Sequence, residues 1–543
     1  MIKKLFIVLG VLIALVIAGV ILLRQVAGPS EAATLVPEDT ILYATFADLP
    51  RSAIRWQGSA LAAISREPEV KALLEKPLAS MKANPGAGEA GGILGGLKPT
   101  RIFAALTEVT AERADAIVGF QFWGGQKDFD AAVARLRREL PASAEQREMY
   151  EGDEIVSTAH GKFSLSTAAH GRWGFLSTSP ELLRSVLGRV RGNASGPTLA
   201  ESADYRSAME RMLSAPDFVF FLRPEKPMNT LLEVGRSLGA DAISEQVSQI
   251  RRTAAVAATW KLDGALQRDA VFFLRPDPAP VGAIEHKAAR FTRGDTVLYV
   301  DFLARLAGLQ QMLVRALPER QEAATELAAL SEKAFGPEAG LILNWPSGQM
   351  TPTPVFALEI RDPSLATASL EKFLRFFPEA TITDRDGLKL YNIPAVSNPL
   401  AAPTLALADG FLLVGLDAGA VSAAAAGGGG ELPSLPAFAS AASAYQESNE
   451  AFAFVDTRAV FERAYAALRP VLLFWAQVSP GAVGGIDTSK LPQTDTVARH
   501  LAPIILSQRR LEQGVLVESS GPFTVSQLAI GVAAGTAWGT AGR

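Results

Sequence analysis

The sequence predicts an α+β protein with an N-terminal single transmembrane helix followed by two tandem pseudo-repeats, each a largely antiparallel sheet with packed helices. Three observations predict this fold class. Leu5–Leu23 contains no charged residue, and the pattern of Asp39–Phe46 recurs much later in the chain. Hairpin signals are mixed with helical patterns, without the regular strand–helix alternation typical of parallel sheets.

The first apolar stretch is long enough to cross a bilayer. Leu5–Leu23 is preceded by Lys3 and Lys4 and followed by Arg24. A helix of this length spans about 28 Å, which is close to the thickness of the hydrocarbon layer. The sequence therefore predicts a membrane anchor over residues 1–27, with the membrane as a partner through Leu5–Leu23.

Two other interpretations of this stretch remain open. A cleaved signal peptide has the same order of parts, and Ser30, Ala32 and Ala33 could form its cleavage site. A buried core helix is the second alternative. Because lysines before an anchor favour a cytoplasmic N-terminus, we expect a single-pass protein of the bacterial cytoplasmic (inner) membrane with its bulk outside the cytoplasm.

The composition is typical of a globular protein with more than one domain. The chain has 543 residues, of which 48% are hydrophobic and 20% are charged. Its formal net charge of -4 makes nucleic acid an unexpected partner, since phosphate binding needs clustered Lys and Arg. The sequence has no cysteine, which excludes disulfides, thiolate metal sites and an acylated-cysteine anchor.

An eight-residue pattern occurs twice. Asp39-Thr-Ile-Leu-Tyr-Ala-Thr-Phe46 and Asp295-Thr-Val-Leu-Tyr-Val-Asp-Phe302 share the form D-T-[IV]-L-Y-x-x-F. A duplicated domain must reproduce its whole hydrophobic plan, so the order of the elements that follow is the test. A long helical region follows in both copies, over Ser52–Lys76 in the first and over Leu303–Ala334 in the second.

The next elements also occur in the same order in both copies. Strand candidates cover Ile117–Phe122 and Val355–Ile360. Each is followed by a helix with an aspartate at its N-cap, Asp128 in the first copy and Asp362 in the second. The apolar residues of each helix fall on one face, so both helices are expected to pack on a sheet.

Each copy also contains two hairpins. The earlier hairpins turn at His170-Gly171 and at Asp409-Gly410, and the later ones turn at Asp263-Gly264 and at Gln513-Gly514. Glycine accepts the positive φ that tight hairpin turns require. Since helix and strand signals lie in the same order between these hairpins, we predict an internal duplication.

The predicted repeats cover residues 35–275 and 290–524. Residues 276–289 form a linker whose prolines stiffen the chain. The chain ends in an apolar, Gly- and Ala-rich tail over residues 525–543, in which Val525–Trp538 is too short to span a membrane. We expect a packed or loose tail, with an interfacial or partner-docking segment as the alternative.

The opening of the first repeat resembles a known family. Pro37-Glu-Asp-Thr-Ile-Leu-Tyr43, followed by Trp56, Glu67-Pro-Glu-Val70 and Leu73-Leu74, is similar to bacterial membrane-anchored proteins of unknown function of the DUF3352 kind. The resemblance implies an N-terminal anchor, an opening strand and a long α+β exterior part. It implies no catalytic residue.

Motifs typical of cofactor and metal sites are weak in this chain. Gly86-Ala-Gly-Glu-Ala-Gly91 matches the dinucleotide fingerprint G-x-G-x-x-G, but it follows Asn84-Pro85 instead of a strand, so we interpret it as a loop. The histidines show no metal-binding spacing, although two of them could meet across a pair of strands. The histidines are His160, His170, His286 and His500, and the two that could meet are His160 and His170.

The acidic pairs and the remaining motifs also have simple interpretations. We interpret Asp128 with Asp130, and Asp384 with Asp386, as solvated caps and turns, because a sequence cannot show whether their pKa values differ. The nucleophile elbow G-x-S-x-G and the phosphate loop are absent from the sequence. We therefore predict no catalytic residue, no cofactor-binding residue, no metal ligand and no cofactor.

These observations favour a membrane-tethered extracytoplasmic binding or scaffolding protein without catalytic activity, whose partner is a protein or an apolar ligand. A periplasmic carrier of an apolar ligand such as lipid is the first alternative. An enzyme with a dispersed site is the second alternative.

Overall fold

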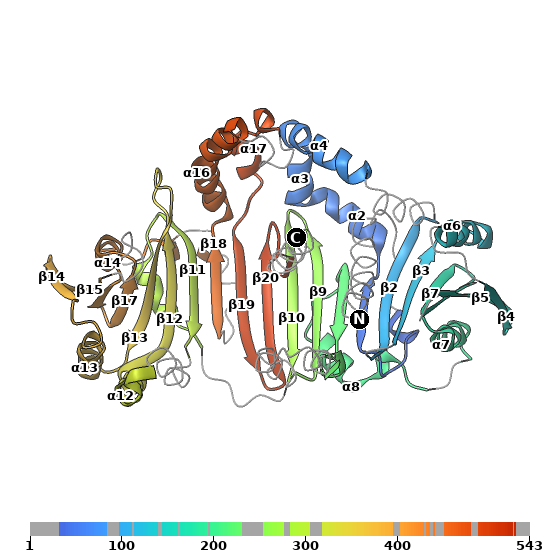
Figure 1. The fold of residues 1–543 in the computed structure, drawn as a ribbon, viewed down its shortest axis with the longest axis horizontal. Coiled ribbons are helices and arrows are strands. Elements are labelled where there is room, and N and C mark those ends of the chain that lie inside the picture. Colours follow the sequence, from blue (N-terminus) through green and yellow to red (C-terminus); the bar gives the residue numbers. More distant parts are fainter. Residues whose placement is uncertain are drawn as a thin grey trace.

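In a computed structural model, twenty strands form one continuous sheet in which every neighbouring pair is antiparallel (Figure 1). The structure describes residues 32–83, 97–110, 113–138, 144–160, 163–193, 196–227, 229–230, 253–275, 283–304, 318–394, 402–427, 430–434, 438–439, 450–478, 487–524 and 526–527.

The strands of the first half are β1 (Leu42–Phe46), β2 (Pro99–Val109), β3 (Ala114–Phe122), β4 (Glu145–Tyr150), β5 (Asp153–His160), β6 (Phe163–His170), β7 (Trp173–Ser177), β8 (Phe218–Leu222), β9 (Ala255–Asp263) and β10 (Leu266–Leu274). Those of the second half are β11 (Thr296–Leu303), β12 (Phe335–Asn344), β13 (Thr353–Ile360), β14 (Thr381–Arg385), β15 (Leu388–Asn392), β16 (Thr404–Ala408), β17 (Phe411–Gly415), β18 (Ala451–Val455), β19 (Ile504–Leu511) and β20 (Gly514–Gly521).

Both halves have the same strand order. From one edge to the seam the order is β4-β5-β6-β7-β3-β2-β1-β8-β9-β10. From the other edge it is β14-β15-β16-β17-β13-β12-β11-β18-β19-β20. The repeated eight-residue pattern forms β1 and β11, which therefore occupy equivalent places, and Tyr43 and Tyr299 are both fully buried there.

The single sheet corrects the predicted fold class, which expected a separate sheet in each repeat. The two halves join because β10 pairs with β20 along its length, from Gln267 opposite Gly521 to Leu274 opposite Gly514. An edge strand presents unpaired backbone N–H and C=O groups. The edge strand β10 of the β9–β10 hairpin and the edge strand β20 of the β19–β20 hairpin satisfy each other's groups. Residues 276–282 of the predicted linker lie outside the described residues.

The predicted transmembrane helix is also corrected. Within the described ranges, no helix is both long enough and apolar enough to cross a membrane. The longest of these helices, α16 (Thr457–Val478), has four charged residues between Arg458 and Arg469, and a charge at the bilayer centre costs about 2.5–3.5 kcal/mol. Leu5–Leu23, the predicted anchor, lies outside the described residues. A single-pass protein of the inner membrane is therefore not supported.

Helices of both halves pack around the sheet. The α-helices of the first half are α2 (Leu49–Gly58), α3 (Ala60–Arg66), α4 (Pro68–Ala83), α6 (Gln126–Arg138), α7 (Pro180–Arg191) and α8 (Ala203–Met209). Those of the second half, besides α16, are α12 (Gln321–Ala334), α13 (Pro363–Leu374), α14 (Ala418–Ala425) and α17 (Thr494–Ala498). Short 3-10 helices include η1 (Ala32–Thr34), η2 (Leu199–Glu201), η4 (Lys287–Phe291) and η9 (Thr488–Lys490).

The N-caps explain where several helices begin. The Asp362 carboxylate accepts hydrogen bonds from the backbone N–H groups of Ser364 and Leu365, as predicted for the first turn of α13. Asp128, in contrast, lies inside the first turn of α6 and accepts from the backbone N–H of Gly125. Helix α6 therefore begins at Gln126, two residues before Asp128, and Asp128 is not its N-cap as predicted.

Five helices form an arch along one end of the strands, with α2, α3 and α4 from the first half and α16 and α17 from the second (Figure 1). The arch closes through Glu67, whose carboxylate oxygens lie 2.7 Å from His500 Nε2 and 2.7 Å from Arg499 Nη2. Glu69 accepts a hydrogen bond of 2.7 Å from the backbone N–H of Gln493. The two halves therefore meet in the arch as well as in the sheet.

Each half has its own main hydrophobic core. In the first half, Tyr43, Phe103, Phe175, Phe221 and Phe272 are all buried in one cluster. This cluster also includes Leu516 of β20. The core of the first half is thus completed by a strand of the second.

Candidate functional site

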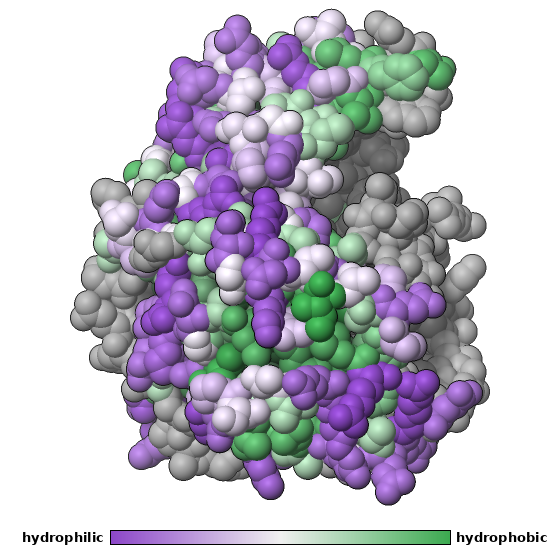
Figure 2. Space-filling model, turned by 90° about the vertical axis from the view of Figure 1, so that its left-hand side faces the viewer, coloured by the Kyte–Doolittle hydropathy of each residue, from purple (hydrophilic) through white to green (hydrophobic). Residues whose placement is uncertain are grey.

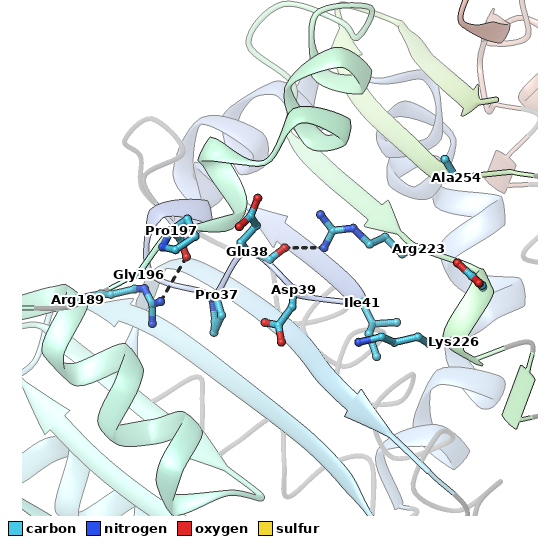
Figure 3. A pocket seen from close by; sticks show the side chains of 11 residues that line it. Pro37, Glu38, Asp39, Ile41, Arg189, Gly196, Pro197, Arg223, Lys226 and Ala254 are labelled. Atoms are coloured by element: carbon cyan, nitrogen blue, oxygen red, sulfur yellow. Dashed lines mark hydrogen bonds between the residues drawn. The ribbon is translucent and has the colours of Figure 1, made fainter. Parts of the chain in front are cut away.

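A cleft of about 590 Å³ lies in the first half, at the end of β1 that is farther from the arch (Figure 3). Ligand pockets commonly have about 300–1,000 Å³. The cleft is therefore large enough for a small organic molecule. Its walls come from separate segments of the chain and consist of Pro37, Glu38, Asp39, Ile41, Arg189, Gly196, Pro197, Arg223, Glu225, Lys226 and Ala254.

The first wall is a turn that leads into β1. The hydroxyl and the backbone N–H of Thr40 both donate to the carbonyl of Pro37, at 2.6 Å and 3.2 Å. The backbone N–H of Glu38 donates to the carbonyl of Pro197 at 3.2 Å. These bonds hold the turn against the segment that follows α7, so the cleft has a defined rim.

Arg223 fixes the shape of this rim and is not free for a ligand. Its guanidinium makes two hydrogen bonds to the Asp204 carboxylate, at 2.6 Å and 2.8 Å. Its remaining nitrogen donates to the carbonyls of Glu38 and Thr40, and Figure 3 shows the bond to Glu38. Burial alone would raise the pKa of Asp204, but the hydrogen bonds and charge of Arg223 outweigh it and lower that pKa.

Arg189, in the last turn of α7, differs from Arg223 because it has no carboxylate partner among the described residues. Its guanidinium donates to the hydroxyl of Ser185 and, at 3.5 Å, to the carbonyl of Pro197. Its Nε is buried without a hydrogen-bond partner. Burial lowers the pKa of the Arg189 guanidinium, although the charges of Asp39 and Glu201 oppose that effect. Arg189 is therefore a partly buried cation whose hydrogen-bond partners are all neutral.

Two further charges in the cleft are available. Within the described residues, neither the Asp39 carboxylate nor the Lys226 ammonium has a hydrogen-bond or ion-pair partner. Figure 3 shows Asp39 between Arg189 on one side and Lys226 on the other. Glu38 and Glu225 also line the cleft, so apart from Arg223, which is paired with Asp204, it offers two cations and three carboxylates to a ligand.

In the second half, the aspartate at the equivalent position is paired. Asp295 is the counterpart of Asp39 in the repeated pattern, and its carboxylate lies 3.2 Å from Arg293 Nε. Its backbone carbonyl accepts a hydrogen bond of 3.0 Å from Arg463 of α16. The equivalent aspartate is therefore already paired, so the available charges distinguish the first half from the second.

The lining residues carry carboxylate, ammonium and guanidinium groups. The lining includes no histidine, serine, threonine or tyrosine. Amines and carboxylates are therefore the groups in the lining that could act as a nucleophile or a base. The arrangement can hold and orient a charged molecule.

The histidines lie apart from this cleft. His160 is opposite Phe163 in the sheet, whereas His170 is opposite Trp173 at the other end of β6. The hypothesis that His160 and His170 meet across the strands is therefore wrong. The Nδ1 of His170 instead lies 3.1 Å from the Asp153 carboxylate. In the part of the chain that the structure describes, three or more metal-ligating side chains never gather at one point.

The acidic pairs occupy turns and helix starts, as predicted. Asp384 accepts a hydrogen bond of 3.0 Å from the backbone N–H of Gly387, in the turn between β14 and β15. Asp130 accepts from the side chain of Gln126 on the exposed side of α6. The glycine motif Gly86–Gly91 lies outside the described residues.

A buried polar cluster in the second half was missed by the sequence reasoning. The Asp301 carboxylate is fully buried and accepts a hydrogen bond of 2.8 Å from the Tyr299 hydroxyl, and His286 Nδ1 lies 3.1 Å from it. Glu338, also buried, accepts from the backbone N–H groups of Glu285 and Lys287. The available signal was that Asp301 stands two residues after Tyr299, on the same face of the strand, where the first copy has threonine.

Glu338 makes stability depend on pH. Burial, followed by repulsion from Asp301, raises the pKa of Glu338. The folded state therefore holds this proton more tightly than the unfolded state, so the contribution of Glu338 to stability is complete below the unfolded pKa and is lost as pH rises through the folded pKa. We expect Glu338→Gln to flatten the dependence of Tm on pH above about pH 4, where an unfolded glutamate begins to lose its proton. Thermal unfolding across that range measures it, with exposed Glu285→Gln as the control, and an unchanged slope would contradict the assignment.

Comparisons with known proteins show no family. No family model matches the chain, and no curated protein matches it. Crystal form I of TP0453 is 7% identical with a TM-score of 0.25 and covers 46% of this chain and 81% of that chain. Crystal form III is 8% identical with a TM-score of 0.24 over the same shares. Scores this low support no argument about function, and the resemblance to DUF3352-like proteins stays a prediction.

Proposed function

We propose that this protein is a binding protein without catalytic activity, and that the cleft lined by Arg189, Asp39 and Lys226 takes a small organic anion. The observation that carries the proposal is the partly buried guanidinium of Arg189 in the cleft wall, whose hydrogen-bond partners are the neutral Ser185 and Pro197. A guanidinium without a carboxylate partner in a partly buried place has already lost part of its hydration. An incoming oxyanion therefore gains charge-assisted hydrogen bonds at a reduced desolvation cost.

The charges around Arg189 refine the class of ligand. Lys226 adds a second cation on the far side of the cleft, as Figure 3 shows, so a ligand with two acidic groups can contact both. Asp39 between them, with Glu38 and Glu225 elsewhere in the lining, can accept hydrogen bonds from hydroxyl or ammonium groups of the same ligand. An apolar ligand such as lipid would leave these charges without partners, so a carrier of an apolar ligand has less support from this cleft.

The test uses the full chain and isothermal titration calorimetry with succinate, glutamate and inorganic phosphate as probes. We expect saturable binding of at least one probe, and we expect Arg189→Gln to weaken it by about 10- to 100-fold, because a hydrogen bond to a charged group contributes about 1.5–3 kcal/mol. Arg135→Gln is the matched control, since Arg135 is exposed on α6 and remote from the lining. Equal affinity in the Arg189→Gln variant and the parent protein would exclude the cleft as the site.

A further inference from the structure

The end of α16 carries an unusual group of exposed apolar side chains. Leu468, Val471, Leu473, Phe474 and Val478 are between 39% and 61% exposed. Within the described residues, no other helix or strand contributes as many large exposed apolar side chains. Figure 2 shows a hydrophobic area at the top of the molecule, where Figure 1 places α16.

The beginning of α16 is held by the body of the protein. The Tyr465 hydroxyl donates to the carbonyl of Pro492, beside η9, and Arg463 donates to the carbonyl of Asp295. Phe461 stacks on Tyr465, with their ring centroids 5.3 Å apart. These contacts hold the first part of the helix, and the exposed apolar side chains follow it along the chain.

The exposed side chains do not lie on one face of the helix. Successive helical residues are rotated by about 100°, so Leu468, Leu473 and Phe474 point in three well separated directions. A helix that packs on a single protein surface is apolar on one side only, whereas a helix that is apolar all round needs an apolar medium around it. The end of α16 is therefore better suited to surroundings that enclose it on all sides than to the flat surface of a protein partner.

The charged residues of this segment are all basic. No acidic residue occurs between Arg463 and Val478, although the whole chain has a net charge of -4. Arg469 is exposed, and among the described residues no carboxylate pairs with it. An apolar helix end with an unpaired arginine at its base is complementary to a surface that is apolar inside and anionic outside.

We propose that the end of α16 inserts into the interfacial layer of a lipid bilayer that contains anionic lipid. Phe474 and its apolar neighbours would enter the boundary between headgroups and acyl chains, and Arg469 would contact an anionic headgroup. This docking uses a helix that lies in the interface and requires no helix that crosses the bilayer. It also lies at the arch, at the opposite end of the strands from the proposed anion cleft.

The absence of cysteine from the sequence permits a site-specific test in the full chain. A polarity-sensitive fluorophore is attached to Phe474→Cys or, as the control, to Met149→Cys on the exposed edge strand β4. Vesicles contain phosphatidylcholine alone or phosphatidylcholine with phosphatidylglycerol, each with or without brominated acyl chains. We expect the emission at residue 474 to shift to the blue and to be quenched by bromine with the anionic vesicles, and the emission at residue 149 to stay unchanged.

A second variant tests the charge. Arg469→Gln in the labelled protein is expected to weaken the partition of residue 474 into the anionic vesicles by about fivefold, since one basic residue near an anionic surface contributes about 1 kcal/mol. If the label at residue 474 stays in water while the protein floats with the vesicles, another segment binds lipid and the proposal is wrong. A blue shift without vesicles that grows with protein concentration would instead identify a second copy as the occupant, and would also overturn it.

Discussion

Replacing Phe272 with alanine is expected to lower the free energy of unfolding by about 3–5 kcal/mol. Phe272 is fully buried in the main core of the first half. It lies on β10 opposite Leu516 of β20, so its ring packs where the two halves join. The truncation leaves a cavity at this seam, and the lost contacts belong to both halves.

Urea denaturation followed by tryptophan fluorescence measures this effect, because Trp173 lies in the first half and Trp345 in the second. Phe273→Ala is the matched control, since Phe273 is the next residue of β10 and is only partly buried on the other face. We expect the control to cost less than half as much. We also expect the two halves of the parent protein to unfold in one transition, because they share β10 and β20. A control that costs as much as Phe272→Ala, or two separate transitions, would contradict the shared core.

Replacing Asp301 with threonine, the residue at the equivalent position of the first half, is expected to destabilise the protein by about 3 kcal/mol. Asp301 is fully buried and serves both the Tyr299 hydroxyl and His286. Removing one member of a buried charged group usually costs about 3–5 kcal/mol, because its partners stay buried without their acceptor. The shorter threonine cannot replace both contacts.

Tyr299→Phe separates the two contacts of Asp301. This variant removes the hydroxyl donor and leaves the carboxylate beside His286, so its expected cost is only about 0.5–1.5 kcal/mol. Chemical denaturation at neutral pH compares the two variants, with the reverse substitution Thr45→Asp in the first half as a further comparison. Thr45 donates to the carbonyl of Ile102 and has no His286 counterpart in the described residues. If Asp301→Thr left the free energy of unfolding unchanged, the contact between Asp301 and His286, which precedes η4, would not stabilise the protein.

Much of the local structure could be predicted because it depends on short-range patterns. The predicted strands Ile117–Phe122 and Val355–Ile360 lie within β3 and β13. The turns at Asp409-Gly410 and Asp263-Gly264 join adjacent hairpin strands with the expected positive φ at glycine. Turn chemistry and alternation act over a few residues, so they are visible in the sequence.

The long helical region over Ser52–Lys76 was predicted less well, because the structure divides it into α2, α3 and α4. Ser59 ends α2 and caps α3, where its hydroxyl accepts a hydrogen bond of 3.2 Å from the backbone N–H of Ala62. Pro68 then begins α4. The serine and the proline were both visible in the sequence, but an apolar period that continues across them conceals the breaks.

The candidate cleft could not be predicted, because its charges come from segments that are distant in the sequence. Asp39 was recognised only as part of a strand pattern, and Arg189 lies in no motif of the sequence. Lys226 lies in no motif. Whether an arginine is paired depends on which carboxylates the fold brings near it, as the contrast between Arg189 and Arg223 shows.

The sequence by itself determined the periodic elements and the order in which they recur, since backbone preferences and hydrophobic alternation act locally. Only the tertiary structure decided that the halves share one sheet. The pairing of β10 with β20 joins residues about 250 positions apart, and any exposed strand edge offers the same backbone donors and acceptors. The partner was selected by the packing of side chains such as Phe272 and Leu516 across the seam, and that packing exists only in the folded protein.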